Sequence, residues 1–535
     1  MSTGAAVGNS HDQVTSRLRR FGDLTVKGEK MESDSNLDAH LLRESTDFDI
    51  EETKTVLRNQ QQQQLVVKFV EEDEEHAVWD EVKKAFELAW PLSLFNVAGF
   101  SVLVITLMFV GRHGGELELS SASIATSFSA VTGFTIMLGL ASTMETLCGQ
   151  AYGAKKYHLL GVYLQAAWIV GFAVGVGVLC LWLNMETILK AAGQDPVIAR
   201  MAAKYLIYMV PGVFGAALIQ PIVKYLQSQS VVIPLLVIAI LTVIIHIIAC
   251  QIIIGTLNFG YTGGAVSTTF SYTCMLMLSC VYTWGSGKFH KTWTGFTWDA
   301  FSYVGVYLKL AVPSTCMLCL EYWTVEFLVL AAGLLPNPEL QLSLLAIGLN
   351  TTNLAFNVPL GLSAAVSTRV ANELGAYRPL AAKLAGKVIF GISISCAICI
   401  ATSMILARHI WGKAFSNVEE VISSVADLMP LIAISAIFDG IQGVLSGIAR
   451  GSGRQDMGAI INLTAFYIVG LPSGLFFGFV WEMSGKGLWI GLLLGQCLQS
   501  LLMLVLVTTM DWEKMSEEAM KRIHSYHLLP TTEKN

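Results

Sequence analysis

Long apolar stretches recur along the chain and are separated by short polar segments. A helix needs about 20 apolar residues to cross the hydrocarbon core of a bilayer. These stretches are continuously apolar rather than alternating, which favours helices over the strands of a membrane barrel. The pattern predicts an all-α polytopic membrane protein with twelve transmembrane helices, at residues 86–111, 121–144, 159–184, 201–225, 231–255, 262–284, 303–334, 341–365, 383–408, 421–446, 457–481 and 487–510.

The two halves of this pattern share a sequence repeat at an offset of 222 residues. The Leu-Ala-x-Pro sequence that ends at Pro91 recurs with its end at Pro313, and Gly153 recurs as Gly375. The offset aligns the first span with the seventh and the second with the eighth, so each half would be a six-helix bundle. Halves of the same topology are related by an axis along the membrane normal, and we expect a central cavity that opens alternately to each side.

The two repeated prolines hold equivalent places in the first helix of each half. Proline inside a membrane helix frees a backbone carbonyl group and can kink the helix. Pro91 and Pro313 are therefore predicted hinges, with an ordinary tolerated kink as the alternative.

Composition and charge divide the chain into four parts. Of its 535 residues, 53% are hydrophobic and 14% are charged, whereas about a quarter of a soluble domain is charged. Residues 1–80 hold 9 basic and 17 acidic residues and a run of glutamines, which is typical of a disordered segment. The predicted parts are a disordered cytoplasmic N-terminal tail (1–80), an N-lobe (81–290), a C-lobe (291–510) and a cytoplasmic C-terminal tail (511–535).

Basic residues in the loops predict how the chain crosses the membrane. With the N-terminus inside, the internal loops carry Lys155, Lys288, Arg378 and Arg454, whereas the outer loop at 256–262 has no basic residue. The bias is moderate because other outer loops carry basic residues, but it favours both termini in the cytoplasm. The plasma membrane and the vacuolar membrane remain equal alternatives for the location.

The sequence offers no pattern for an enzyme. The ten cysteines lie in apolar runs or at their ends, whereas metal binding and redox chemistry need polar, accessible surroundings. We find no phosphate-binding loop and no cluster of metal ligands or nucleophiles. We expect no catalytic activity, no metal, no cofactor and no nucleic-acid partner, and a monomer in the lipid bilayer.

Carboxyl groups at membrane depth are the first candidates for function, because they are costly unless they face a cavity and act there. Glu321 lies in the seventh predicted span and Asp439 in the tenth. Asp439 shares one helix face with Ser435, Gln442 and Ser446. Burial disfavours the charged form of a carboxyl group, so we expect this pair to bind and release protons.

Asparagines form a second polar stripe, in the eighth span, where Asn350, Asn353 and Asn357 lie on one helix face. With Tyr322 and Gln442 they are predicted to line a substrate cavity. The alternative for the asparagines is interhelical hydrogen bonding, which polar residues commonly supply in membranes.

Three further ionisable residues receive other roles. Glu326 lies about 140° around its helix from Glu321, so both are not expected on one cavity wall. Glu145 stands near the Lys155–Lys156 loop and is predicted to be a cytoplasmic gate or a structural ion pair. His246, in the fifth span, has no recognisable companion and is interpreted as a packed polar residue.

Five motifs resemble those of plant members of the multidrug and toxic compound extrusion (MATE) family, in the family's order and over residues 80–510. They are Glu145–Lys155 (ETLCGQAYGAK), Cys319–Trp323 (CLEYW), Gly333–Pro338 (GLLPNP), Ser367–Ala376 (STRVANELGA) and Gly447–Gly453 (GIARGSG).

This resemblance implies a V-shaped pair of six-helix bundles and cation-coupled efflux of organic compounds, generally driven by protons in plant members. It also implies that Glu321 and Asp439 are the coupling pair of the C-lobe and that Pro91 and Pro313 are associated with bending. Prokaryotic members with an acid inside the first helix differ from this chain, so an N-lobe ion site is not expected.

Together the residues and the resemblance predict a secondary active transporter. It would export small organic compounds, such as xenobiotics or secondary metabolites, from the cytosol in exchange for H⁺, with Na⁺ less favoured as the coupling ion. The alternative is a passive anion or solute channel on the same scaffold.

Overall fold

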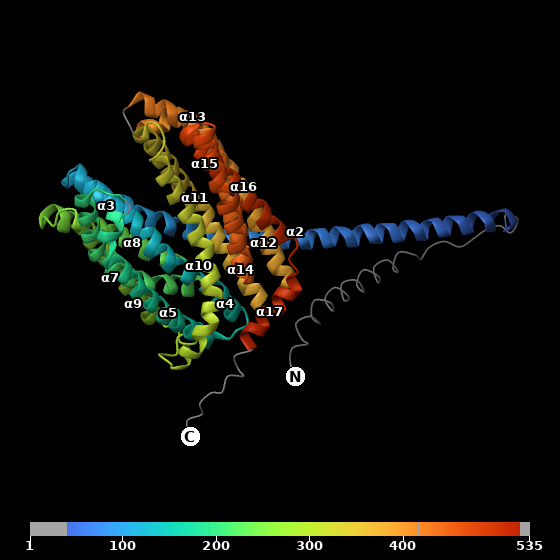
Figure 1. Ribbon diagram of the computed structural model, residues 1–535. Helices are drawn as coiled ribbons and strands as arrows, with labels where there is room; N and C mark the ends of the chain where they lie inside the picture. Colours follow the sequence, from blue (N-terminus) through green and yellow to red (C-terminus); the bar gives the residue numbers. More distant parts are fainter. Residues whose placement is uncertain (1–39, 192, 416–417, 525–535) are drawn as a thin grey trace, which may run out of the picture. The chain divides into compact units, whose positions relative to one another are not determined.

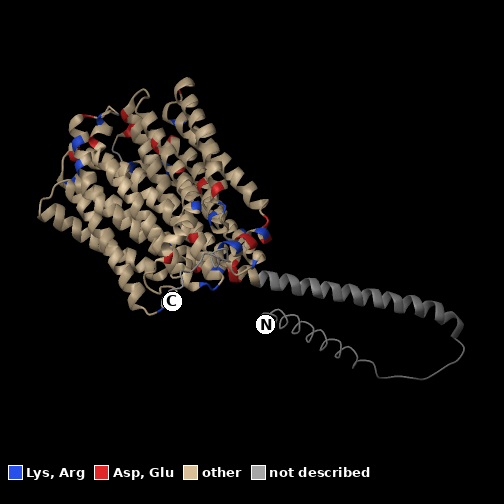
Figure 2. Ribbon diagram, turned by 60° about the horizontal axis from the view of Figure 1, so that its bottom comes forward, with Lys and Arg blue, Asp and Glu red and all other residues tan. Residues whose placement is uncertain are grey.

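The computed structural model describes residues 40–191, 193–415 and 418–524, and of residues 40–76 only the backbone. Throughout this described part the regular structure is helical and no strand occurs. Twelve helices are long and apolar enough to cross a membrane, which confirms the predicted number. In Figure 2 the charged residues lie mainly toward the two ends of the helical body.

The spans of the first half are α2 (His40–His113), then α3 (Glu116–Ser129), η2 (Ala130–Phe134) and α4 (Thr135–Gly153) as one span, α5 (Tyr157–Leu183), α7 (Pro196–Ser228), α8 (Ile233–Cys250) with η3 (Gln251–Thr256), and α9 (Thr262–Gly285). A short helix, α6 (Met185–Ala191), precedes α7.

The spans of the second half are α10 (Asp299–Ala332), α11 (Pro338–Gly375), α12 (Pro379–Trp411) with η4 (Gly412–Ala414), α13 (Glu419–Ser452), then α14 (Gln455–Asn462), η5 (Leu463–Gly470), α15 (Leu471–Leu475) and η6 (Phe476–Val480) as one span, and α16 (Ser484–Thr508). A last helix, α17 (Trp512–His524), follows.

The structure differs from the prediction of a disordered tail over residues 40–80. The backbone of these residues is helical and forms the first part of α2. The physical reason is helix propensity, because glutamine, glutamate, lysine and leucine dominate this stretch and are good helix formers even when they are too polar to build a core. The remainder of the predicted tail, residues 1–39, lies outside the described residues.

Figure 1 shows α5, α7, α8 and α9 on one side of the spanning body and α12, α13, α15 and α16 on the other, with α4, α10 and α11 between them. The lobes exchange parts of their first helices. Ala85 and Ala89, at the start of the spanning part of α2, belong to the hydrophobic core of the C-lobe. Tyr307 and Ala311, at the start of α10, belong to the core of the N-lobe. These are equivalent residues under the 222-residue offset, so the exchange is reciprocal.

Glycines allow the closest approaches between the lobes, and they obey the same offset. A Cβ atom added to Gly139 would lie 2.6 Å from the Cα atom of Thr315, and one added to Gly361 would lie 2.6 Å from the backbone nitrogen of Ser93. The two contacts are images of each other under the repeat. The repeat read from the sequence is therefore a true two-fold relation of the packing.

Near this two-fold axis, equivalent residues of the two lobes meet at one end of the molecule. A Cβ atom on Gly149 would contact that of Ala371, its own repeat equivalent, at 2.6 Å. Helix α17 also joins the lobes there, since Met515 belongs to the C-lobe core and Ile523 to the N-lobe core. The loop charges predict that this end is cytoplasmic, and it is called the inner end below.

Both predicted hinge prolines lie inside continuous helices. Pro91 is an interior residue of α2 and Pro313 of α10. Pro91 lies between Ala89 and Leu92, which both belong to the C-lobe core, and Pro313 follows Ala311, which belongs to the N-lobe core. This place suits a bend, and hinging remains a prediction.

Candidate transport site

The C-lobe holds a polar network at the middle of its spans. Glu321 comes from α10, and its Oε1 atom accepts a 2.8 Å hydrogen bond from the amide of Gln442 on α13. The Oε1 atom of Gln442 in turn accepts a 2.9 Å bond from the Ser446 hydroxyl one turn further along α13. The hydrogen bond between α10 and α13 thus extends the polar spacing seen in the sequence into a chain of three polar side chains.

Asp439 lies on the same α13 face and is 7% exposed. Its Oδ1 atom accepts a 2.7 Å bond from the amide of Gln496 on α16. The Asp439 and Glu321 carboxyl groups are close enough for their charges to act on each other. The structure therefore brings the two predicted acids into one site.

Amide side chains that the sequence reasoning missed complete this site. Gln499 donates to the Asn462 side chain at 2.8 Å, and Asn462 donates to the backbone oxygen of Met317 at 2.7 Å. Within the described part of the chain, the Oε1 atoms of Gln496 and Gln499 are buried without a hydrogen-bond partner. The spacing of these two glutamines, i and i+3 inside an apolar span, was the signal that could have identified them.

A surplus of acceptors defines what this site can do. Two carboxyl groups and two glutamine oxygens face donors that come only from amides and one hydroxyl. A protonated carboxyl group adds a donor, whereas a carboxylate adds a further acceptor and a charge. The arrangement therefore suits groups that take up and release a proton.

The asparagine stripe on α11 has a different setting. Asn350 and Asn353 are exposed, whereas Asn357 is buried and donates a 2.9 Å bond to the backbone oxygen of Asn353 on its own helix. In the described residues no hydrogen bond joins this stripe to Glu321 or Asp439. Cavity lining by the asparagines remains a prediction. The bond that Asn357 donates stays within its own helix and so is not the interhelical bond of the alternative.

Two aromatic residues next to Glu321 lie at the boundary with the other lobe. Tyr322 is 40% exposed, which is consistent with its predicted place in a cavity wall. The indole of Trp323 donates a 3.4 Å bond to the backbone oxygen of Val131 in the π-helical segment η2 of the N-lobe. A π-helical turn alters backbone pairing and is frequent at functional sites.

Glu145 is buried at the inner end, and its ion-pair partners come from helices other than the nearby Lys155–Lys156 loop. Its carboxylate lies 2.5 Å from Lys224 Nζ on α7 and 3.1 Å from Arg450 Nε on α13. The contact with Arg450 joins the lobes, as the predicted gate requires. The spacing along the sequence could not identify these partners, because both come from helices far away in the chain.

Further polar bonds close the inner end beside this ion cluster. Gln227 donates to the Thr368 hydroxyl at 3.0 Å, and Gln150 donates to the backbone oxygen of Gly451 at 3.2 Å. Arg522 of α17 donates to the Gln150 side chain at 3.1 Å and to the backbone oxygen of Ser452 at 3.2 Å. Each bond connects the two lobes or braces that connection.

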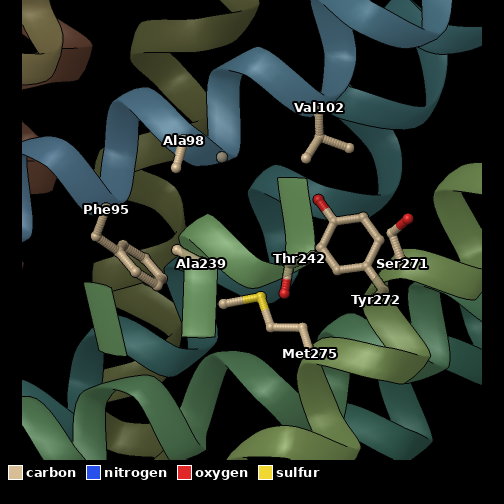
Figure 3. Close-up of a pocket in the computed structure, with 9 residues that line it drawn as sticks. Phe95, Ala98, Val102, Ala239, Thr242, Ser271, Tyr272 and Met275 are labelled. Carbon is tan, nitrogen blue, oxygen red and sulfur yellow. The ribbon is translucent and has the colours of Figure 1, made fainter. Parts of the chain in front are cut away.

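The N-lobe has a polar centre of another kind. His246 is fully buried, 2.9 Å from the Thr106 hydroxyl and 2.8 Å from the Ser271 hydroxyl. Ser271 also borders a cavity of about 40 Å³ between α2, α8 and α9, drawn in Figure 3. The lining contains hydroxyl and apolar side chains and no carboxyl group: Phe95, Ala98, Gly99, Val102, Ala239, Thr242, Ser271, Tyr272 and Met275.

Known proteins match this chain along nearly all of its spanning body. The MatE family model matches twice, over residues 91–252 and 313–476. The two matches begin at Pro91 and Pro313, which places the family repeat at the offset found in the sequence.

The relatives found are plant proteins of one kind. Over 452 residues the chain is 42% identical to Protein DETOXIFICATION 16 of Arabidopsis thaliana, covering 84% of this chain and 93% of that protein. It is 43% identical to Protein DETOXIFICATION 17 of the same organism over 448 residues, with 84% and 94% covered.

Solved structures agree. The eukaryotic MATE transporter AtDTX14 superposes with a TM-score of 0.81 at 38% identity, over 84% of this chain and all of that one. A MATE transporter of Vibrio cholerae superposes with a TM-score of 0.74 at 16% identity, over 82% of this chain and all of that one, which supports the fold alone. The predicted MATE-type fold is confirmed.

Proposed function

Since this chain belongs to the MATE family of membrane transporters, we propose that it is a proton-coupled antiporter that exports small organic compounds from the cytosol by alternating access. The observation that carries the proposal is that Glu321 and Asp439, two neighbouring acids at membrane depth, each accept a hydrogen bond from a buried glutamine amide. Neighbouring carboxyl groups in a site of low polarity compete for protons and cations, which is what exchange of one for the other requires.

The direction of exchange follows from the two compartments. On the acidic side of the membrane the carboxyl groups bind protons, which cancels their attraction for an organic cation and releases it. On the neutral cytosolic side they lose those protons and attract the next substrate. Net export then requires that the protonated and the loaded forms both change conformation, because a ligand shifts only the equilibrium between states that it binds unequally.

Alternating access is supported by the polar closure of the inner end. The ion cluster around Glu145 and the bonds of Gln227 and Gln150 hold the lobes together there, which corresponds to a state closed to the cytosol. The same end carries the basic loops, so the proposal places both termini in the cytoplasm, in the plasma or the vacuolar membrane. In the proposed cycle this closure breaks while the opposite end closes.

The substrates we propose are small, amphipathic organic molecules, with cations preferred because the site offers acceptors and negative charge. Tyr322 and Trp323 would supply aromatic faces, to which organic cations are attracted. The coupling ion we propose is H⁺, and no cofactor is required.

Purified protein in liposomes with ethidium as the probe cation tests this function. An imposed proton gradient should drive ethidium accumulation, an equal sodium gradient should not, and E321Q and D439N should each abolish the accumulation. The matched control is E326Q, the same change one and a half turns along α10, which should leave transport near the wild-type rate. Full transport by both neutral variants, or ohmic currents in the absence of a proton gradient, would overturn the proposal.

A further inference from the structure

Two cations share one carboxylate at the inner end. The Glu145 side chain is 1% exposed, with Lys224 at 13% and Arg450 at 8%. Lys224 and Glu145 lie in the same lobe, on α7 and α4, whereas Arg450 lies in the other lobe, on α13. The buried cluster therefore carries one positive charge in excess, and only one of its two ion pairs crosses between the lobes.

Separation of the lobes at this end has unequal consequences for the two cations. Glu145 would keep Lys224 as its partner, because both move with the N-lobe. Arg450 would keep only the Ser363 hydroxyl of α11, which accepts a 2.8 Å bond from its Nη2 atom. A buried charge without a counter-charge costs several kcal/mol unless another partner is found, so opening of the inner end leaves Arg450 in need of an anion.

The anions within reach of Arg450 in its own lobe are the C-lobe acids. Gln442, Ser446 and Arg450 follow one another at intervals of four residues and so lie along one face of α13. The first two are already bonded in a chain that ends on the Glu321 carboxylate. The charge of Arg450 also acts on Glu321 in the closed arrangement.

The charged groups with which Arg450 interacts come from both lobes. Glu145 faces it from α4, Lys224 from α7 and Glu321 from α10, and α11 contributes the neutral Ser363. Asp439 lies further along α13 itself. Arg450 thus stands between one acid of the N-lobe and two acids of the C-lobe.

We propose that Arg450 is a positioning residue for proton coupling: a counter-ion held by Glu145 when the inner end is closed and passed to Glu321 when it opens. This inference rests on the proposed antiport and adds to it the link between the gate and the acids. With Arg450 held by Glu145, Glu321 binds a proton readily. Once the lobes part, the guanidinium stabilises the Glu321 carboxylate and the proton leaves toward the cytosol.

The exchange of partners couples the proton affinity of Glu321 to the conformation. Proton affinity is high in the state open to the acidic side and low in the state open to the cytosol. By linkage, protonation of Glu321 favours the closed inner end by the same factor. Allosteric couplings of this kind typically amount to five- to 150-fold.

Infrared titration of the purified protein in lipid nanodiscs tests the proposal without a substrate. The carbonyl band of the protonated Glu321 carboxyl group is assigned by its loss in E321Q. In R450Q the midpoint of this band should move to higher pH by about one unit, a tenfold gain in proton affinity. In E145Q, which frees Arg450, it should move to lower pH by a similar amount, and R450K should stay near the wild-type midpoint.

The double variant E145Q/R450Q separates partner exchange from simple charge removal. If Glu145 acts on Glu321 through Arg450, the double variant titrates like R450Q. If the two charges act independently, their shifts add and nearly cancel, and a wild-type midpoint in the double variant would overturn the proposal.

Lys224 supplies the matched control. K224Q removes one cation from the same carboxylate on the N-lobe side and leaves Arg450 in place, so the Glu321 midpoint should rise much less than in R450Q. A rise of the Glu321 midpoint equal to that in R450Q would overturn the proposal, since either cation of the cluster would then have the same effect on Glu321. Failure of the proposed antiport would give a different result. Neither E321Q nor D439N would then lose a titrating carbonyl band, whatever the effect of the variants at Glu145, Lys224 and Arg450.

Discussion

The two lobes share their packing but not their chemistry. Under the 222-residue offset, Gly99 of the N-lobe is the counterpart of Glu321 in the C-lobe. Gly99 borders a small cavity lined by apolar groups and hydroxyls, whereas Glu321 joins a network of amides with a second carboxyl group. In contrast, the contacts between the lobes at Gly139 and Gly361 are equivalent pairs.

This contrast shows which parts of the duplicated frame are fixed by geometry. Residues near the two-fold axis must fit against their own images, so both copies retain small residues there. Residues away from the axis meet only their own lobe, and one copy can lose an acid while the other keeps it. A symmetric frame therefore allows the proposed ion coupling to lie in one lobe without any change in the crossing helices.

The largest expected effect comes from breaking the symmetric part at Gly153 and Gly375. A Cβ atom at either position would overlap backbone atoms of the opposite lobe, Asn372 for the first and Gln150 for the second. Backbone cannot yield as a flexible side chain can, so G153A and G375A should each destabilise the protein by at least the upper end of about 1–3 kcal/mol. Thermal unfolding in detergent measures the loss.

The matched controls are G177A on α5 and G391A on α12, where an added Cβ atom meets nothing within 4 Å. Alanine in an open helical position stabilises the helix by up to about 1 kcal/mol. If G153A and G375A lose strongly different amounts of stability, the two equivalent contacts do not contribute equally to stability. The lobes would then be symmetric in shape only.

The sequence predicted the helical spans and their repeat better than it predicted the contacts between side chains. Apolar length identified twelve spans, and the Pro91–Pro313 and Gly153–Gly375 matches identified the repeat, because both are local signals. The Lys224 and Arg450 partners of Glu145 were not predictable, since they depend on which helices meet at the inner end. The amide pair Gln496 and Gln499 could have been identified by the rule that singled out Asp439.

The helix over residues 40–80 and the hydrogen bond of Asn357 have local causes. The tail over residues 40–80 is helical because its polar residues favour helix even without a core to bury. Asn357 bonds to a carbonyl of its own helix, a choice open to any buried asparagine that a count of polar residues on one face does not reveal.

A transplant of the acid sharpens the chemical side of the comparison. G99E in an E321Q background places a carboxyl group at the N-lobe counterpart, where an added Cβ atom meets nothing within 4 Å. Proton-driven ethidium transport should stay abolished, because the surrounding cavity offers the hydroxyls of Thr242 and Ser271 but no amide donor and no second acid. Transport in proteoliposomes is the measurement.

The variant G99Q/E321Q controls for bulk at this position and should fold and behave like G99E/E321Q. Recovery of coupled transport in G99E/E321Q alone would show that either lobe can couple once it has an acid. The asymmetry would then reside in a single residue rather than in the amide network.

The smallest expected effect concerns the polar centre of the N-lobe. His246 sits between the Thr106 and Ser271 hydroxyls, and its surroundings supply no carboxylate with which it could exchange a proton. H246Q keeps an amide able to bond one of these hydroxyls, so the variant should lose about 1 kcal/mol of stability, the typical net worth of one hydrogen bond. The pH dependence of ethidium transport should match that of the wild type if, as proposed, proton exchange takes place at Glu321 and Asp439 of the C-lobe. A shifted pH profile of transport in H246Q, with E321Q still inactive, would mean that both lobes take part in coupling through different chemistry. The assignment of coupling to one lobe would then be wrong.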